Sequence, residues 1–222
     1  MRASYRESIL LALVFFPISG HAADSLEAFG LHWTVPARAD WKVEDLDGVQ
    51  TLSLLVPKPS TQPRRPTQFA LADTLDYLTV TLEAEVKKEP KALRNRKNSL
   101  IFVYAYRDAD HFDYVHLSDD LGSSSPQHNG IFHVYGGDRV RISSTEGPAT
   151  LTEEKWYKVR LVYDGSSGKM EVFVDGQTSP SLRAVDMSLS AGKVGLGSFF
   201  DTGQFRNVKI HGQTRGVGVS LR

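Results

Sequence analysis

The sequence of 222 residues contains no cysteine. The folded chain can therefore have neither disulfide bonds nor thiolate zinc sites, and a cysteine nucleophile is excluded. Neither sign of charge is in excess, because 26 basic residues balance 26 acidic ones. A net charge near zero argues against duplex nucleic acid as a partner, since binding phosphates needs a positive field. A chain of about 200 residues can bury a sufficient core without disulfides.

Long apolar runs are scarce, and the one near the N-terminus has the composition of a secretory signal peptide. Arg2 and Arg6 precede the apolar run 9–16, and small residues follow up to Ala22. This run is shorter than the roughly 20 residues that span a bilayer, so a membrane anchor is the weaker alternative. We expect cleavage after Ala22, which leaves a periplasmic or secreted chain without a membrane span.

Instead of helices, the sequence has short segments with the period of β-strands. From Tyr77 the pattern is strict, with Leu82 and its alternate neighbours on one face and Glu83 and its neighbours on the other. A first hairpin is expected across Asp47-Gly48, joining strands at 41–45 and 50–55. Further strands are expected at 69–71, 99–106, 112–117, 131–135, 139–143, 155–164, 169–175, 192–197 and 205–211.

Turn signals recur about every ten residues, which predicts an all-β, two-sheet antiparallel jelly-roll sandwich. We place the sandwich at residues 41–212, after a lead-in at 23–40 with little periodicity and before a tail at 213–222. The first hairpin and the last strand are expected to be neighbours. Ten alternating positions are predicted to form the core between the sheets: Val80, Leu82, Ala84, Val115, Leu117, Val159, Leu161, Val172, Val174 and Leu196.

Five segments resemble exported bacterial concanavalin A-like jelly rolls, in the style of laminin-G-like domains and the 3-keto-disaccharide hydrolase domain family. The segments are 110–117, 128–132, 155–161, 168–176 and 194–203. The resemblance covers roughly residues 40–212 and implies a concave sheet face that meets sugar chains. Many relatives end in Phe-x-Asp-Val, whereas the third position here is Asn207, which weakens the case for a structural cation there.

The residues with candidate chemistry lie between 104 and 141. Alternation along 112–117 puts Tyr114 and His116 on one face. Val140 and Ile142 have the character of core residues, which would put Arg139 on the opposite face together with Arg141. We predict that Tyr114, His116 and Arg139 are the catalytic set on one concave patch. The predicted ligand-binding residues around them are Tyr104, His128, Asn129, His133 and Arg141.

This set of side chains suits two kinds of sugar chemistry. In β-elimination of a uronic acid, a cation neutralises the carboxylate while a histidine or tyrosine removes the neighbouring proton. In plain binding, aromatic rings offer their faces to sugar rings. The Arg-x-Glu-Leu, Gln-x-His and Tyr-x-Lys-x-Gly motifs of jelly-roll alginate lyases are absent. Whether the chain is an enzyme is therefore left open. Three functions remain: a carbohydrate-binding module, a lyase or hydrolase, and a laminin-G-like protein-interaction domain.

Two acidic patterns have alternative interpretations. Glu83 and Glu85 share a strand face about 7 Å apart, near glycosidase separations, but such residues are usually the wet side of a strand. Oxygen-rich loops bind calcium, yet the aspartates flanking the histidine-rich strand match no defined calcium loop. We predict no metal site and no cofactor, with calcium left open at these aspartates: Asp108, Asp110, Asp119 and Asp120.

The signal-peptide interpretation predicts a mature N-terminus at Ala23 or Asp24. Mass spectrometry of the chain recovered from periplasm or culture medium should give that N-terminus. A chain that begins at Met1 and fractionates with membranes would contradict the prediction.

Overall fold

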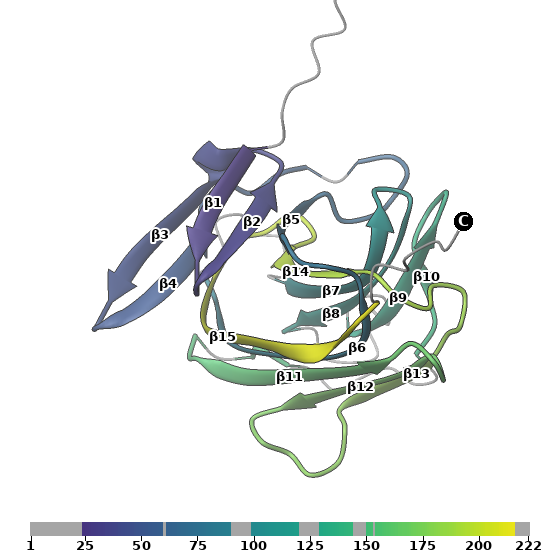
Figure 1. Cartoon of the computed structure of the whole chain (residues 1–222). Helices are drawn as coiled ribbons and strands as arrows, with labels where there is room; N and C mark the ends of the chain where they lie inside the picture. Colours follow the sequence, from purple (N-terminus) through teal and green to yellow (C-terminus); the bar gives the residue numbers. More distant parts are fainter. Residues whose placement is uncertain are drawn as a thin grey trace, which may run out of the picture.

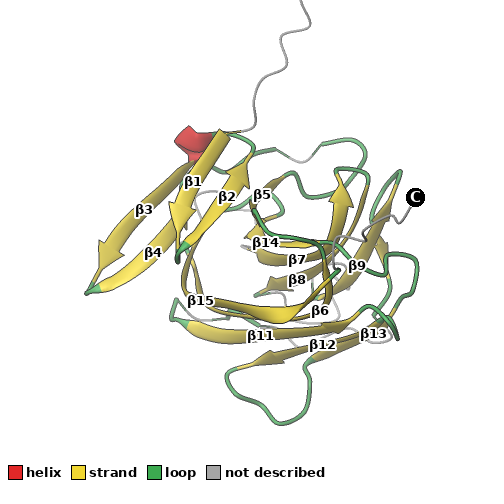
Figure 2. Ribbon diagram, viewed as in Figure 1, coloured by secondary structure: helices red, strands yellow, loops and turns green. Residues whose placement is uncertain are grey.

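The computed structural model describes residues 24–59, 61–89, 99–119, 129–143, 150–152 and 154–215. Two antiparallel sheets pack face to face, and the one helical turn among these residues is the short 3-10 helix η1 (Arg38–Asp40) (Figures 1 and 2). No helix in the described ranges has the length and apolar character needed to cross a bilayer. The predicted all-β jelly-roll sandwich is confirmed.

The first sheet has eight strands and contains the histidine-rich segment. In spatial order its strands are β1 (Asp24–Ala28), β2 (Leu31–Val35), β5 (Gln68–Ala72), β14 (Lys193–Ser198), β7 (Ser99–Asp108), β8 (His111–Ser118), β9 (Gly130–Tyr135) and β10 (Val140–Arg141).

The second sheet has seven strands, with β6 in the middle. In spatial order they are β13 (Leu182–Val185), β12 (Lys169–Val174), β11 (Tyr157–Asp164), β6 (Tyr77–Lys88), β15 (Gly203–Thr214), β4 (Val49–Leu54) and β3 (Trp41–Leu46). The expected neighbours are confirmed, because β15 pairs with β4 of the first hairpin.

The first hairpin forms where the sequence predicts it. Asp47 and Gly48 join β3 to β4 with φ values of 55° and 77°. Two consecutive positive φ angles are what a two-residue turn needs to follow the twist of its strands, and Asp and Gly tolerate them. The pairing of Leu46 with Val49 fixes the register of the hairpin.

The lead-in expected at residues 23–40 is incorrect, because β1 and β2 lie there and belong to the eight-stranded sheet. Trp33 and Val35 are buried in the core, and Trp33 Nε1 donates to the Ala28 carbonyl at 3.0 Å. Each strand has only five residues and buries two side chains. The alternation is too short to stand out in the sequence, and the packing becomes evident only in the folded chain.

The main core fills the space between the sheets. It combines Leu82 and Leu161 of the seven-stranded sheet with Phe102 and Val115 of the eight-stranded sheet. All ten predicted core positions belong to this cluster and are buried. Strand alternation therefore gave the inward face of both sheets correctly.

A second apolar cluster lies on the opposite face of the eight-stranded sheet. Its members come from that sheet or directly follow it: Phe69, Ile101, Val103, Phe112, Tyr114, Phe132, Val134 and Phe199. The segment 61–67 lies over this face, where the Arg64 carbonyl accepts from Arg139 N at 3.0 Å and Arg65 pairs with Asp110. Both faces of this sheet are therefore largely covered.

The core assignment predicts a large effect for Leu82→Ala. Removing a fully buried leucine side chain at the centre of β6 should lower the free energy of unfolding by about 2–5 kcal/mol. Leu75→Ala is the matched control, because Leu75 is 54% exposed and its truncation should change stability by less than about 0.5 kcal/mol. Equal denaturation midpoints for the two variants would contradict the assignment.

Candidate functional site

The three residues predicted as catalytic come together on the outer face of the eight-stranded sheet. Tyr114 and His116 lie on β8, and Arg139 precedes β10. Arg139 Nη1 donates to the Tyr114 hydroxyl at 3.0 Å and contacts His116 Nδ1 at 2.9 Å. We call this group the arginine cluster. The three side chains converge in the structure, whereas a catalytic role for them remains a prediction.

Aromatic rings fix the position of the arginine in this cluster. The guanidinium carbon of Arg139 lies 4.4 Å from the centre of the Phe132 ring and 4.6 Å from that of Phe199. The imidazole of His116 is stacked on Phe199 with ring centroids 5.7 Å apart. Cations held against aromatic faces in this way are stabilised by the ring quadrupole.

The protonation states in the arginine cluster disfavour proton abstraction. Tyr114 is fully buried, and this burial raises the pKa of its phenol despite the neighbouring arginines. Because an arginine only donates hydrogen bonds, His116 Nδ1 must accept, and the ring proton then sits on Nε2. The phenol is neutral and the basic imidazole nitrogen is occupied, so this arrangement lacks a ready general base.

Tyr104 and His133 were predicted to lie on the same patch, and this is wrong. Tyr104 belongs to the core between the sheets, and His133 alternates with Phe132 and Val134 of the outer cluster. His133 Nδ1 is 2.6 Å from Asp113 Oδ1 across the β8–β9 pairing. The side chains of Tyr104 and His133 therefore lie on the inward side of the sheet.

The other predicted ligand-binding residues have structural contacts. Asn129 Oδ1 accepts from Ser118 N at 2.9 Å and from Thr150 Oγ1 at 3.0 Å, so its amide ties the start of β9 to the end of β8. Arg141 donates to the Asn129 carbonyl at 2.7 Å and lies over Phe132, on the face of the arginine cluster. His128 lies outside the described residues.

The structure also locates Val140 and the aspartates at which calcium was left open. Val140, expected in the core, is 60% exposed because β10 is an edge strand. The aspartates considered for calcium are separated, because Asp108 and Asp110 lie at one end of β8 and Asp119 at the other. Asp119 Oδ2 instead pairs with Lys88 Nζ at 2.8 Å. Asp120 lies outside the described residues.

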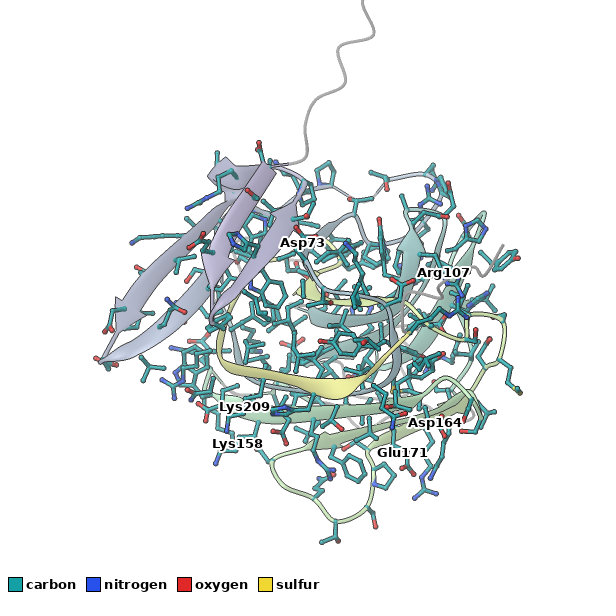
Figure 3. All side chains as sticks on the ribbon, in the orientation of Figure 1. Asp73, Arg107, Lys158, Asp164, Glu171 and Lys209 are labelled. Carbon is teal, nitrogen blue, oxygen red and sulfur yellow. The ribbon has the colours of Figure 1, made fainter. Side chains whose placement is uncertain are left out.

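A polar hollow lies on the other sheet. A groove of about 370 Å³ crosses the outer face of β15, β6, β11 and β12. Lys158 and Lys209 lie near each other on this side of the molecule (Figure 3). The side chains that define the groove are Glu83, Glu85, Lys158, Arg160, Phe173, Asn207 and Lys209.

The register of the strands arranges the groove residues in two rows. In the first row, Glu83 of β6 stands between Lys209 of β15 and Arg160 of β11. In the second row, Glu85 stands between Arg206 of β15 and Lys158 of β11. Opposite charges facing each other across strands are mutually favourable. The sequence had marked only the two glutamates, because their cationic neighbours become visible only from the pairing of distant strands.

Glu85 is held as a carboxylate. Arg206 Nε donates to Glu85 Oε2 at 2.8 Å, and Arg206 lies 4.0 Å over the ring of Trp156. Burial acts to raise the pKa of Glu85, but hydrogen bonds from Arg206 and Asn207 outweigh it, so the pKa is below its ordinary value. A glycosidase acid needs the opposite shift, which argues against proton donation by Glu85.

Asn207 has a special backbone position beside the groove. Its φ is 52°, and the pairing of β15 with β6 shifts register between Arg206 and Lys209. Asn tolerates the left-handed region better than most residues, and bulges of this kind re-aim side chains. This conformation is a physical reason for a short polar residue at position 207, a requirement that Asn and Asp both meet.

Comparison with known proteins adds the fold but no family. No protein-family model and no curated protein matches the sequence. The carbohydrate binding module CBM66 from Bacillus subtilis is 15% identical with a TM-score of 0.57, covering 81% of this chain and 94% of that one. A xylan β-1,4-xylosidase from Bacillus halodurans is 12% identical with a TM-score of 0.52, covering 87% of this chain and 40% of the enzyme. At these identities the similarity shows a shared sandwich fold, and the narrower family resemblance remains a prediction.

The environment of Glu85 predicts a pH-dependent cost for Glu85→Gln. A lowered pKa in the folded chain contributes stability above the ordinary glutamate pKa of about 4.3, and this contribution is lost as pH falls through the folded value. The substitution should cost about 0.5–1 kcal/mol at pH 7 and progressively less below pH 4. Urea denaturation at pH 7 and at pH 3 measures this difference.

Glu83→Gln is the control for this experiment. Among the described residues, Glu83 forms no ion pair, although it lines the same groove. The control should show little pH-dependent change. An equal cost of Glu85→Gln at pH 7 and pH 3 would contradict the argument.

Proposed function

We propose that this domain binds a saccharide in the groove on the outer face of its seven-stranded sheet. The observation that carries the proposal is the ion pairing of the charged side chains that line the groove. Within the described ranges, Glu83, Lys158, Arg160 and Lys209 line the hollow without an ion pair to another side chain. Charged groups arranged on rigid strands around an open groove are suited to hydrogen-bond the hydroxyl groups of a sugar.

The composition of the groove favours an acidic saccharide. Two carboxylates, Glu83 and Glu85, face four cations in the two rows, so positive charge is in excess. The guanidinium of Arg160 lies 4.0 Å over the Phe173 ring, which holds it as a directed donor. Arginine recognises carboxylate and sulfate groups through paired hydrogen bonds. A uronic-acid-containing or sulfated chain therefore fits better than a neutral one.

Binding without cleavage is the better-supported form of this proposal. Hydrolysis in the groove would need a protonated carboxyl group as the acid, and Glu85 is unsuited to that role because Arg206 holds it ionised. The shared fold with a protein named as a carbohydrate binding module is consistent with this interpretation. Export to the periplasm or medium, which would bring the domain to polysaccharides, is part of the proposal.

The groove proposal predicts which variants lose affinity. Retention on gels containing acidic or neutral polysaccharides should be strongest for the acidic chains. The double variant Lys158→Gln/Lys209→Gln should weaken that retention roughly tenfold or more, which corresponds to about 1.4 kcal/mol. Both lysines are exposed, so the fold should be unaffected.

Lys42→Gln is the matched control, because Lys42 is an exposed lysine on the edge strand β3 of the same sheet. It should retain wild-type affinity. Equal retention of the groove variant and the wild-type chain, or no retention on any polysaccharide, would refute the groove as the binding site.

The arginine cluster is the second candidate, for cleavage of an acidic sugar by β-elimination. It is favoured by Arg139, which brings a carboxylate-binding cation against Tyr114 and His116. In this alternative the ligand must displace Arg139 from His116 before the imidazole can accept a proton. Absorbance from unsaturated products, lost in His116→Ala, would support it. Retention of an acidic polysaccharide with no such product would support binding alone.

A further inference from the structure

A second set of polar side chains lies at the boundary between the two sheets, away from both candidate surfaces. Asp113 of β8 and His133 of β9 face inward from the eight-stranded sheet. Asp186 follows β13, the edge strand of the seven-stranded sheet. Ligand atoms from these three residues lie within 4.8 Å of one another.

The three residues are oriented toward a common point. His133 Nδ1 is 2.6 Å from Asp113 Oδ1 and 4.0 Å from Asp186 Oδ2. The other oxygen of Asp186 is occupied, because Ser188 N donates to Oδ1 at 2.7 Å. The turn after β13 therefore fixes Asp186 with Oδ2 directed at the imidazole.

Asp113 has an unmet bonding requirement. Its side chain is 1% exposed, and in the described part of the chain its Oδ2 accepts no hydrogen bond. The phenol of Tyr104 lies near this carboxylate, because Tyr104 of β7 is paired with Asp113 across the two strands. A buried carboxylate oxygen without a partner is costly, and such atoms in native structures commonly face a water or an ion.

We propose that Asp113, His133 and Asp186 bind a divalent transition-metal ion, of the Zn²⁺ or Mn²⁺ type, between the two sheets. Two carboxylates and one imidazole give a nitrogen-and-oxygen donor set that suits such ions. Calcium fits less well, because it takes six to eight oxygen ligands. The side chains of His133 and Asp186 are 15% and 18% exposed, which gives the ion a path from solvent.

The geometry requires only small movements to close around an ion. Ligand atoms about 2.1 Å from a zinc ion are separated from one another by roughly 3–3.5 Å. The present separations from His133 Nδ1, 2.6 Å and 4.0 Å, lie on either side of that range. The ion would replace the proton shared by Asp113 and His133 and would draw Asp186 closer.

Binding of such an ion would link the two sheets at the contact between β9 and β13. Its ligands come from β8 and β9 on one sheet and from the turn after β13 on the other. An ion that binds the folded chain raises its stability in proportion to the logarithm of ion concentration over Kd. The site therefore acts on stability and does not depend on saccharide binding in the groove.

Equilibrium dialysis of the full chain, with any purification tag removed, against ZnCl₂ or MnCl₂ tests this proposal. The wild-type chain should bind one more equivalent of at least one of these ions than Asp186→Asn does. Adding the ion should also raise the melting temperature of the wild-type chain but not that of Asp186→Asn. Asp186 is partly exposed, so the variant should fold, and circular dichroism checks this. His133→Gln should give the same loss, with affinity at least tenfold lower.

Asp108→Asn is the matched control, because Asp108 Oδ1 is 2.8 Å from His111 Nδ1 in an exposed His–Asp pair outside the three-residue site. It should bind the ion as the wild-type chain does. Equal stoichiometry and equal melting shifts in wild type and Asp186→Asn would overturn the proposal. Binding of Ca²⁺ in preference to both Zn²⁺ and Mn²⁺ would also overturn it, since the donor set would then have been misassigned.

Discussion

The strict two-residue alternation of β6 is the constraint on which both the core and the groove depend. As the middle strand of the seven-stranded sheet, β6 directs Leu82 and Ala84 into the core and Glu83 and Glu85 outward. A shift of one residue in its pairing would bury the carboxylates and expose the leucine. The core therefore fixes the register, and the register in turn places each glutamate between its cationic neighbours.

Polar groups on the covered faces of the sandwich are held by specific partners. At the start of β7, the buried Asp201 Oδ2 accepts from the Ser99 amide at 3.0 Å and from its hydroxyl at 2.9 Å, which ties this strand to the turn before β15. On the outer face of the eight-stranded sheet, Arg139 serves Tyr114 and His116 together. Such buried networks favour one arrangement of the strands, because a partly broken network leaves polar atoms unsatisfied.

Sequence pattern predicted the fold well and the sites only partly. Alternation placed Leu82, Leu161 and Val115 in the core, and it placed Tyr114 and His116 on a common face, because a strand has a fixed period. The same period places His133, which follows Phe132, on the inward face with Asp113, so the prediction that it lies beside His116 is wrong. The groove was missed because its cations reach Glu83 and Glu85 only through the pairing of β11 and β15 with β6, which no local pattern encodes.

The place of β15 has a consequence for the order in which the sheet can form. β15 is the last strand in the described part of the chain, yet it lies between β4 and β6, which precede it by more than a hundred residues (Figure 1). During synthesis the β3–β4 hairpin therefore has no neighbour in its sheet until the final segment leaves the ribosome. Pairings this distant in sequence form slowly because the intervening chain must first be closed into a loop. A nascent chain stalled before residue 203 would hold the seven-stranded sheet as two separate pieces, each with an open edge where β15 belongs.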